Sequence, residues 1–185
     1  TIAQPHERSD VDPLTRDAEA EEAIAFLRAL VAAQPAGEAA VQALISYKMS
    51  EAGAVVENRP FDPAGVPVIG EFAMARAQQA GERVNVIGRL PGAASRRSLL
   101  MFAHPDSEPV AGTDTWVHDP FSGTIVGGRL YGWGVADDLA GIAAGALAIS
   151  RAARAGVTLG DVIMISAPSK RHARGVAAAM HQGVI

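Results

Sequence analysis

The alternation of apolar and polar residues along the first third of the chain predicts two helices and then a strand. Residues 17–33 carry apolar side chains at helical spacing and charged side chains elsewhere, which is typical of an amphipathic helix. A second helix is expected over residues 38–52, where Gly53 stops it. Residues 54–61, "AVVENRPF", are typical of a strand. Residues 62–81 give mixed signals and predict no element.

Three further apolar segments predict the strands of a sheet. Residues 84–90, "VNVIGRL", alternate like a half-buried strand. Residues 98–103, "SLLMFA", and 161–167, "DVIMISA", are continuous apolar runs, so we expect both to be strands covered on both faces.

Glycine and helical periodicity organise the rest of the chain. Residues 123–134 are glycine-rich and predict a short hairpin or loop. Residues 137–156 predict a helix that begins with two aspartates and ends at Gly156, and residues 173–181 predict a last helix. This order of strand, helix and strand predicts an α/β sheet with helices on both faces.

Composition excludes several classes of protein. With 185 residues, 49% of them hydrophobic, the chain is long enough for one domain with a buried core. The formal net charge of −4 does not favour nucleic acid or a membrane surface as a partner. The absence of cysteine excludes disulfides, cysteine-ligated zinc and a thiol nucleophile. Without an apolar run long enough for a membrane span or a signal peptide, we expect a cytoplasmic protein, and the alternative is a mature secreted one, which would look the same.

Two polar clusters are candidates for chemistry. His104 and Asp106 directly follow the apolar run at 98–103, and functional side chains project from the carboxyl ends of strands in α/β folds. A histidine followed by a carboxylate suits a metal ligand with an orienting partner. The alternative is an ordinary turn, since His-Pro-Asp is also turn chemistry.

The second cluster is Asp137 and Asp138, which follow the glycine-rich "YGWGVA" and begin the predicted helix. They are candidates for a site, and the alternative is helix capping, because aspartate is favoured at N-caps. The glycine-rich loop lacks both a P-loop and a dinucleotide fingerprint, which argues against a nucleotide-binding domain.

Together, the two clusters resemble the M20 family of metallopeptidases and deacylases. The matching stretches are "AHPDSEPV" and "WVHDPFSGTIVGGRLYGWGVADDLAG". The matching positions are His104, Asp106, Trp116, Asp119, Pro120, Phe121, Gly128, Arg129, Leu130, Tyr131, Gly132, Gly134 and Asp137. The resemblance implies a three-layer αβα catalytic domain with a mostly parallel mixed sheet.

The resemblance also implies roles for three residues. His104 would bind a metal ion, and Asp137 would bridge two ions or hold one. Asp106 would be a catalytic residue that hydrogen-bonds the His104 imidazole and fixes its tautomer. The implied cofactor is one or two divalent ions, with zinc the first expectation and manganese or cobalt the alternatives. The metal would activate a water for attack on an amide carbonyl.

The chain departs from the family where a Glu-Glu pair, general base and metal ligand, should follow the strand at 161–167. Ser169 and Lys170 stand there instead, and no carboxylate side chain follows. His172 is a candidate substitute as ligand, base or substrate-binding group. The alternative for this basic segment is a solvated turn, and a further one is a site for a substrate carboxylate.

The chain is also shorter than members of the family, which are about twice as long. We therefore expect residues 1–185 to be the amino-terminal part of the catalytic domain, with the lid or dimerisation domain and the remaining ligands in a missing carboxyl-terminal half or a second chain. The resemblance also implies a homo-oligomer.

The leading hypothesis is a metal-dependent hydrolase that cleaves a C–N bond, amide or amine, in a small carboxylated substrate. The related 5-nitroanthranilic acid aminohydrolase shows that this scaffold accommodates unusual substrates. The alternative is a non-catalytic M20-like binding or assembly subunit that has lost the general base.

Overall fold

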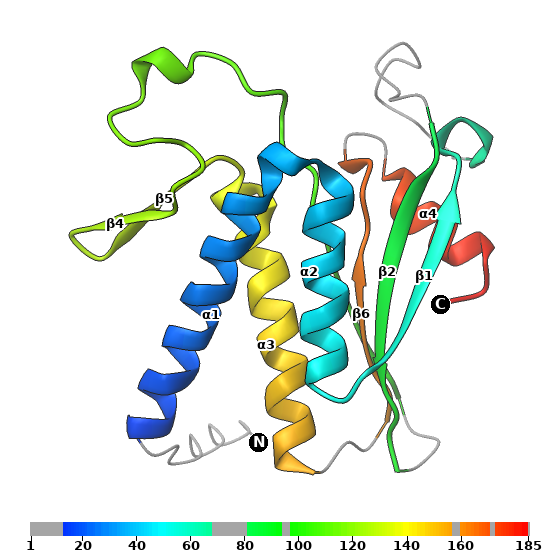
Figure 1. The fold of residues 1–185 in the computed structure, drawn as a ribbon. Helices are drawn as coiled ribbons and strands as arrows, with labels where there is room; N and C mark the ends of the chain where they lie inside the picture. The colour runs from blue at the N-terminus through cyan, green and yellow to red at the C-terminus, as the bar shows by residue number, and fades with distance from the viewer. Residues whose placement is uncertain (1–12, 68–80, 94–96, 157–159, 171–172, 185) are drawn as a thin grey trace, which may run out of the picture.

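The computed structural model describes residues 13–67, 81–93, 97–156, 160–170 and 173–184, which form a four-stranded sheet, a hairpin and four α-helices (Figure 1). The elements are α1 (Pro13–Ala33), α2 (Glu38–Glu51), β1 (Val55–Phe61), β2 (Arg83–Leu90), β3 (Leu99–Ala103), β4 (Thr124–Val126), β5 (Arg129–Tyr131), α3 (Ala140–Ala155), β6 (Val162–Ser166) and α4 (Arg174–His181).

The sheet has the strand order β1-β2-β6-β3 and is mixed. β6 is parallel to β3, whereas β1 with β2 and β2 with β6 pair antiparallel. The predicted α/β class and mixed sheet are confirmed, but parallel pairings do not predominate among the described strands. A parallel pair of neighbouring strands needs a crossover connection, and α3 supplies one between β3 and β6.

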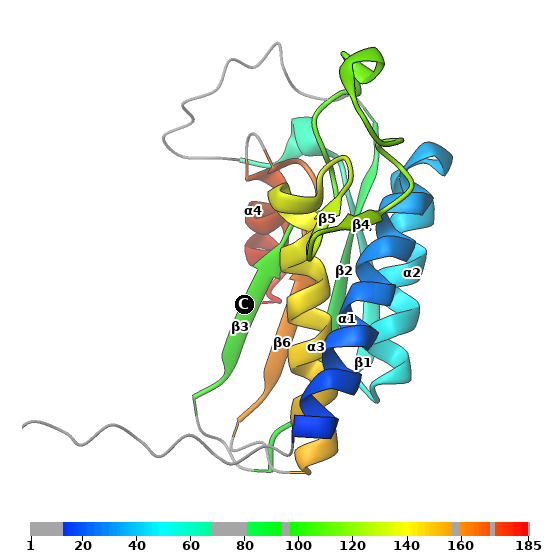
Figure 2. The same cartoon turned by 90° about the vertical axis from the view of Figure 1, so that its left-hand side faces the viewer.

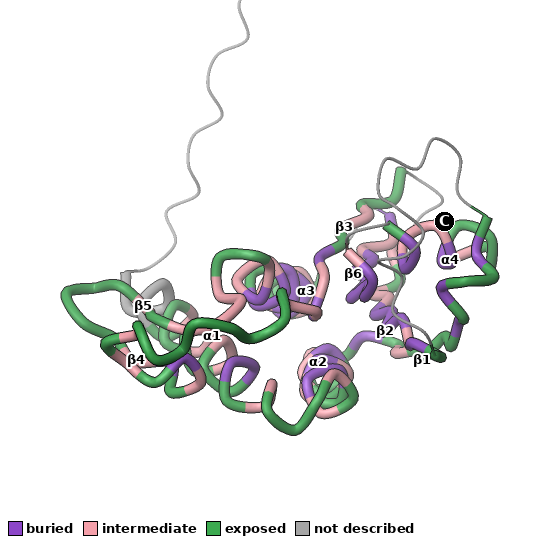
Figure 3. Tube along the Cα trace, turned by 90° about the horizontal axis from the view of Figure 1, so that it is seen from above, coloured by how far each residue is buried: buried purple, intermediate pink, exposed green. Residues whose placement is uncertain are grey.

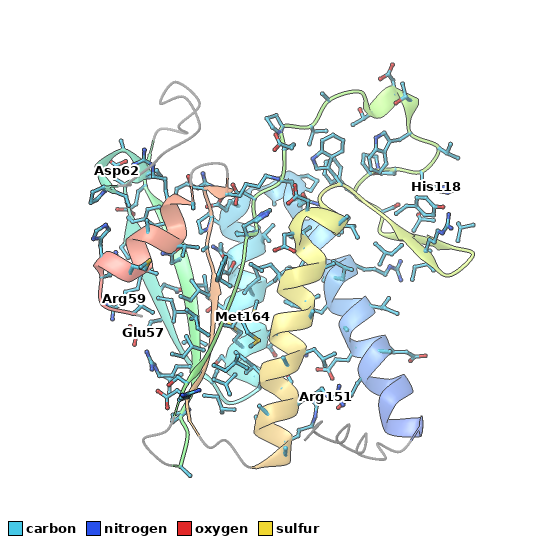
Figure 4. All side chains as sticks on the ribbon, turned by 180° about the vertical axis from the view of Figure 1, so that it is seen from behind. Glu57, Arg59, Asp62, His118, Arg151 and Met164 are labelled. Atoms are coloured by element: carbon cyan, nitrogen blue, oxygen red, sulfur yellow. The ribbon has the colours of Figure 1, made fainter. Side chains whose placement is uncertain are left out.

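Helices cover both faces of the sheet, as predicted (Figures 2 and 3). On one face, α1, α2 and α3 bury a core that includes Val86 and Met164. On the other face, α4 packs over Ile163 and Ile165. Figure 4 shows Met164 between β6 and α3. The sheet therefore positions the loops at its strand ends between two helical layers.

β6 is covered on both faces as predicted, but β3 is not. Leu99 is 55% exposed and Phe102 is 62% exposed, while Ala103 is buried. β3 is the edge strand of the described sheet, and only its side toward α3 is well covered. The prediction of two-sided cover was wrong because a continuous apolar run does not distinguish an edge strand from a central one.

The helix predicted from residue 137 begins three residues later, at Ala140. Asp137 and Asp138 lie in the turn Val135–Leu139 with non-helical backbone angles. Gly156 ends the helix in the left-handed conformation, as predicted. Among the described residues, we find no helix whose length and hydropathy would let it cross a membrane.

Candidate metal centre

The structure brings the two predicted clusters into contact. His104 directly follows β3, and Asp137 lies in the turn that leads into α3. Nε2 of His104 is 2.9 Å from Oδ1 of Asp137. The peptide bond between Asp137 and Asp138 is cis. Both side chains thus meet at the carboxyl end of β3, where functional groups gather in α/β sheets.

Asp106 contacts His104 through its backbone rather than its carboxylate. Nδ1 of His104 is 3.0 Å from the carbonyl oxygen of Asp106, whereas it is 3.9 Å from the carboxylate oxygen Oδ1 of the same residue. A carbonyl oxygen only accepts hydrogen bonds, so Nδ1 is the donor. Nε2 then faces the Asp137 carboxylate, and this pair of acceptors requires a proton or a metal ion between them.

The Asp106 carboxylate instead binds the turn after β6. Its Oδ2 accepts hydrogen bonds from the backbone N–H groups of Ser169 at 3.1 Å and Lys170 at 3.2 Å. The Arg83 guanidinium lies 3.7 Å from the same oxygen. Ser169 has a left-handed backbone (φ 71°), which turns successive N–H groups toward one anion. Asp106 therefore ties the end of β3 to the end of β6.

Lys170 occupies the other side of Asp137. Its Nζ donates to Oδ2 of Asp137 at 2.7 Å and lies 3.4 Å from Oε1 of Glu108. Burial lowers the pKa of Lys170, but the hydrogen bond to Asp137 and the charge of Glu108 outweigh it and raise the pKa above its usual value. The hydrogen bond from Lys170 lowers the pKa of Asp137. Lys170 is therefore an ammonium at neutral pH and cannot act as a base.

Glutamine and glycine hold the surrounding loops in place. Gln34 accepts a hydrogen bond from the Ser107 hydroxyl at 2.9 Å and donates to the carbonyl of Trp133 at 2.9 Å. Gly134 has a left-handed backbone, and a Cβ there would lie 1.9 Å from Oγ of Ser107. A Cβ at Gly132 would lie 2.9 Å from Val31 and Val135. These two glycines therefore leave space for neighbouring side chains.

The alternative interpretation of the two aspartates as helix caps is not supported. The N-cap of α3 is Leu139, and no side chain caps it. Asp138 instead lines a cavity of about 110 Å³ together with His104, Ser169 and Lys170. This cavity gives the polar cluster an accessible space that suits one small group.

The basic segment after β6 is only partly described. His172 lies outside the described residues, so its candidate role stays a prediction. Arg174 is 5% exposed and its guanidinium donates to the carbonyl of Val66. It is therefore part of the interior, and neither a solvated cation nor a ready partner for a substrate carboxylate.

The described residues fit part of a metal site. Imidazole and carboxylate are suitable ligands, and catalytic zinc takes three of them from the protein. His104 and Asp137 supply two, and the described part of the chain contains no cluster of three histidine, aspartate or glutamate side chains that would hold an ion. Glu108 was not predicted as a site residue, because nothing in the sequence indicates its contact with Lys170, although it lies only four residues after His104.

Comparison with known proteins places these segments in a family. Residues 100–181 match the model of Peptidase family M20/M25/M40. Succinyl-diaminopimelate desuccinylase of Methylorubrum populi is 36% identical over 107 residues, which are 57% of this chain and 23% of that enzyme. The enzyme of the same name from Gluconobacter oxydans is 30% identical over 124 residues, 67% of this chain and 28% of that enzyme. The chain therefore matches about a quarter of these relatives' length.

Solved structures share the fold. Human carnosine dipeptidase 1 aligns with a TM-score of 0.58 and 18% identity, over 83% of this chain and 32% of that one. An M20 family metallo-carboxypeptidase from Sulfolobus solfataricus aligns with a TM-score of 0.59 and 18% identity, over 80% and 30%. The stretch that matches Peptidase family M20/M25/M40 includes both His104 and Asp137, and the chain is similar to members of that family.

Proposed function

We propose that the chain is part of a metal-dependent hydrolase that cleaves a C–N bond, amide or amine, in a small carboxylated substrate. The observation that carries this proposal is the 2.9 Å contact between Nε2 of His104 and Oδ1 of Asp137. Because Nδ1 of His104 donates to the Asp106 carbonyl, the two facing acceptor atoms need a proton or a metal ion between them. A divalent ion meets that need and is the cofactor implied by the family.

Each residue of the candidate site has a separate role in this proposal. His104 and Asp137 would hold the ion, for which zinc is the first candidate and manganese or cobalt are alternatives. Such an ion, when bound, would act as a Lewis acid and lower the pKa of a water bound to it. Asp106 fixes the His104 ring through its carbonyl and the turn at Ser169 through its carboxylate. The base and further ligands would come from residues outside those described, including His172, or from a second chain.

Support for the substrate class comes from the curated relatives. Those reported above are named succinyl-diaminopimelate desuccinylases, which indicates removal of an acyl group from a small carboxylated amine. The cavity beside His104 has a volume of about 110 Å³ within the described residues, which suits one small group. Walls contributed by other segments would complete the substrate pocket.

The proposal is tested with a panel of N-acyl amino acids and aromatic amines, assayed with zinc, manganese or cobalt. His104→Ala and Asp137→Ala are expected to lose bound metal and hydrolysis together. His118→Ala is the matched control, because His118 packs edge-on against Tyr131 on the arm that projects from the sheet (Figure 4). Metal content and hydrolysis that stay unchanged in both site variants would refute the proposal.

One observation favours the non-catalytic alternative. The Lys170 ammonium already pairs with Asp137, and the described residues include no third ligand. If the protein assembles normally but neither binds a divalent ion nor hydrolyses any member of the panel, it is a binding or assembly subunit of the M20 type.

A further inference from the structure

The two oxygens of the Asp137 carboxylate have different partners. Oδ1 faces the His104 imidazole at 2.9 Å, and Oδ2 accepts a hydrogen bond from the Lys170 ammonium at 2.7 Å. A carboxylate that bridged two metal ions would use both oxygens. Here one side is available to a metal with His104, and the other side already holds a cation.

Lys170 is fixed in this position at both ends. Its backbone N–H donates to Oδ2 of Asp106, which fixes the start of the side chain. Its Nζ lies between the carboxylates of Asp137 and Glu108, at 2.7 and 3.4 Å, and its side chain is 12% exposed. Two carboxylates that face one point stabilise a positive charge there, and the Lys170 ammonium occupies that point. A divalent ion at the same place would be repelled by the fixed positive charge.

We propose that the Lys170 ammonium takes the place of a metal ion on the Oδ2 side of Asp137, so that the site holds at most one divalent cation, on the His104 side. This inference rests on the proposed metal-dependent function and specifies its metal stoichiometry. The other side of the Asp137 carboxylate is neutralised by the protein itself.

The test is a titration of the full chain with Co²⁺, followed by visible absorption and equilibrium dialysis, in the wild type and two variants. Lys170→Glu exchanges the ammonium for a carboxylate ligand, and Lys170→Met removes the charge without adding a ligand. Lys48→Met is the matched control, because Lys48 is also paired with two carboxylates and 17% exposed, but lies on α2. Far-UV circular dichroism confirms that each variant is folded.

We expect Lys170→Glu to bind one equivalent more than the wild type, with at least tenfold higher affinity for the added ion than Lys170→Met shows. Lys48→Met should match the wild type. Two equivalents bound by the wild type, or no gain in either folded Lys170 variant, would overturn the inference.

Failure of the proposed function gives a different result. If the wild type binds no Co²⁺ and Lys170→Glu binds one equivalent, the role of Lys170 as an internal cation stands and the metal-dependent activity of the wild type does not. If the wild type binds one equivalent that His104→Ala loses, the proposed metal site stands whatever the Lys170 variants do.

Discussion

The backbone N–H of Ser169 donates a hydrogen bond of 3.1 Å to the carboxylate of Asp106, 63 positions earlier in the chain. This contact joins the loop after β3, which carries His104, to the turn after β6, which carries Lys170. The loop that carries His104 and the turn that carries the internal cation are therefore tied together by one carboxylate.

Removing that carboxylate is expected to destabilise the fold. Asp106→Ala leaves two backbone N–H groups without their acceptor and removes a nearby anion from Arg83, so we expect a loss of about 3 kcal/mol in the free energy of unfolding. Asp106→Asn keeps one acceptor oxygen and should lose about 1 kcal/mol. Urea unfolding measures both values. Equal stability of Asp106→Ala and the wild type would show that the two loops are held by other contacts.

A small residue is required where α4 meets the turn after β6. A Cβ at Gly175 would lie 2.4 Å from the backbone oxygen of Pro168, which cannot move aside like a flexible side chain. We expect Gly175→Ala to destabilise the protein by about 2–3 kcal/mol through overpacking. Gly65→Ala is the control, because nothing lies within 4 Å of a Cβ there. Thermal unfolding of the two variants should separate them, and similar melting temperatures would contradict the close packing at Gly175.

The partly buried pair of Arg83 and Glu38 should contribute more than an exposed pair. Nε of Arg83 donates to Glu38 at 2.8 Å, and the Arg83 side chain is 10% exposed. Arg83→Met should therefore cost about 2–3 kcal/mol. Arg59→Met, which breaks the exposed pair with Glu57 on β1 (Figure 4), should cost less than about 1 kcal/mol. Chemical denaturation distinguishes these values, and equal costs would contradict the role of burial.

The ion pair of Lys170 and Asp137 gives stability a defined pH dependence. The folded pKa of Asp137 is lowered below 3.8 by the Lys170 hydrogen bond, so this contribution is present above pH 3.8 and is lost as the pH falls through the folded pKa. For Lys170, burial opposes the charge, but pairing with Asp137 raises the folded pKa above 10.5, so its contribution is present below pH 10.5 and is lost as the pH rises through the folded pKa.

Lys170→Met should thus be less stable than the wild type between these limits and approach it outside them. Asp137 is 69% exposed, so the difference should stay below about 1 kcal/mol. Unfolding of Lys170→Met, Asp137→Asn and the double variant across this pH range measures it. The two single effects should not add, and full additivity would show that the charges do not interact.

The bounds of the helices and strands were predicted better from the sequence than their burial and their position in the sheet. Periodicity located α2 and β2 to within one residue at each end. The prediction of a half-buried strand at β2 was wrong, because the four consecutive residues 85–88 are buried. Periodicity also did not show that Phe102 lies on an edge strand, since an apolar run has the same composition at the edge and in the centre of a sheet. Position in the sheet depends on pairings between segments that are distant in the chain.

The candidate site was predicted only in part for the same reason. His104 and Asp137 were located by motif and by the rule that active groups follow strands. The contact between Lys170 and Asp137 could not be predicted from the sequence. It depends on the left-handed backbone at Ser169 and on two loops that meet only after folding. The contact of Asp106 with His104 through a carbonyl likewise depends on local geometry that residue identity does not specify.

The most direct test of the central claim is the long-range ¹H–¹⁵N spectrum of the imidazole nitrogens during titration of the ¹⁵N-labelled full chain with Zn²⁺. We expect Nε2 of His104 to shift to the value of a metal-bound nitrogen, and we expect this change to be absent in Asp137→Ala. Unchanged His104 nitrogens at saturating Zn²⁺, or an identical response in Asp137→Ala, would contradict the claim that His104 and Asp137 together bind the metal.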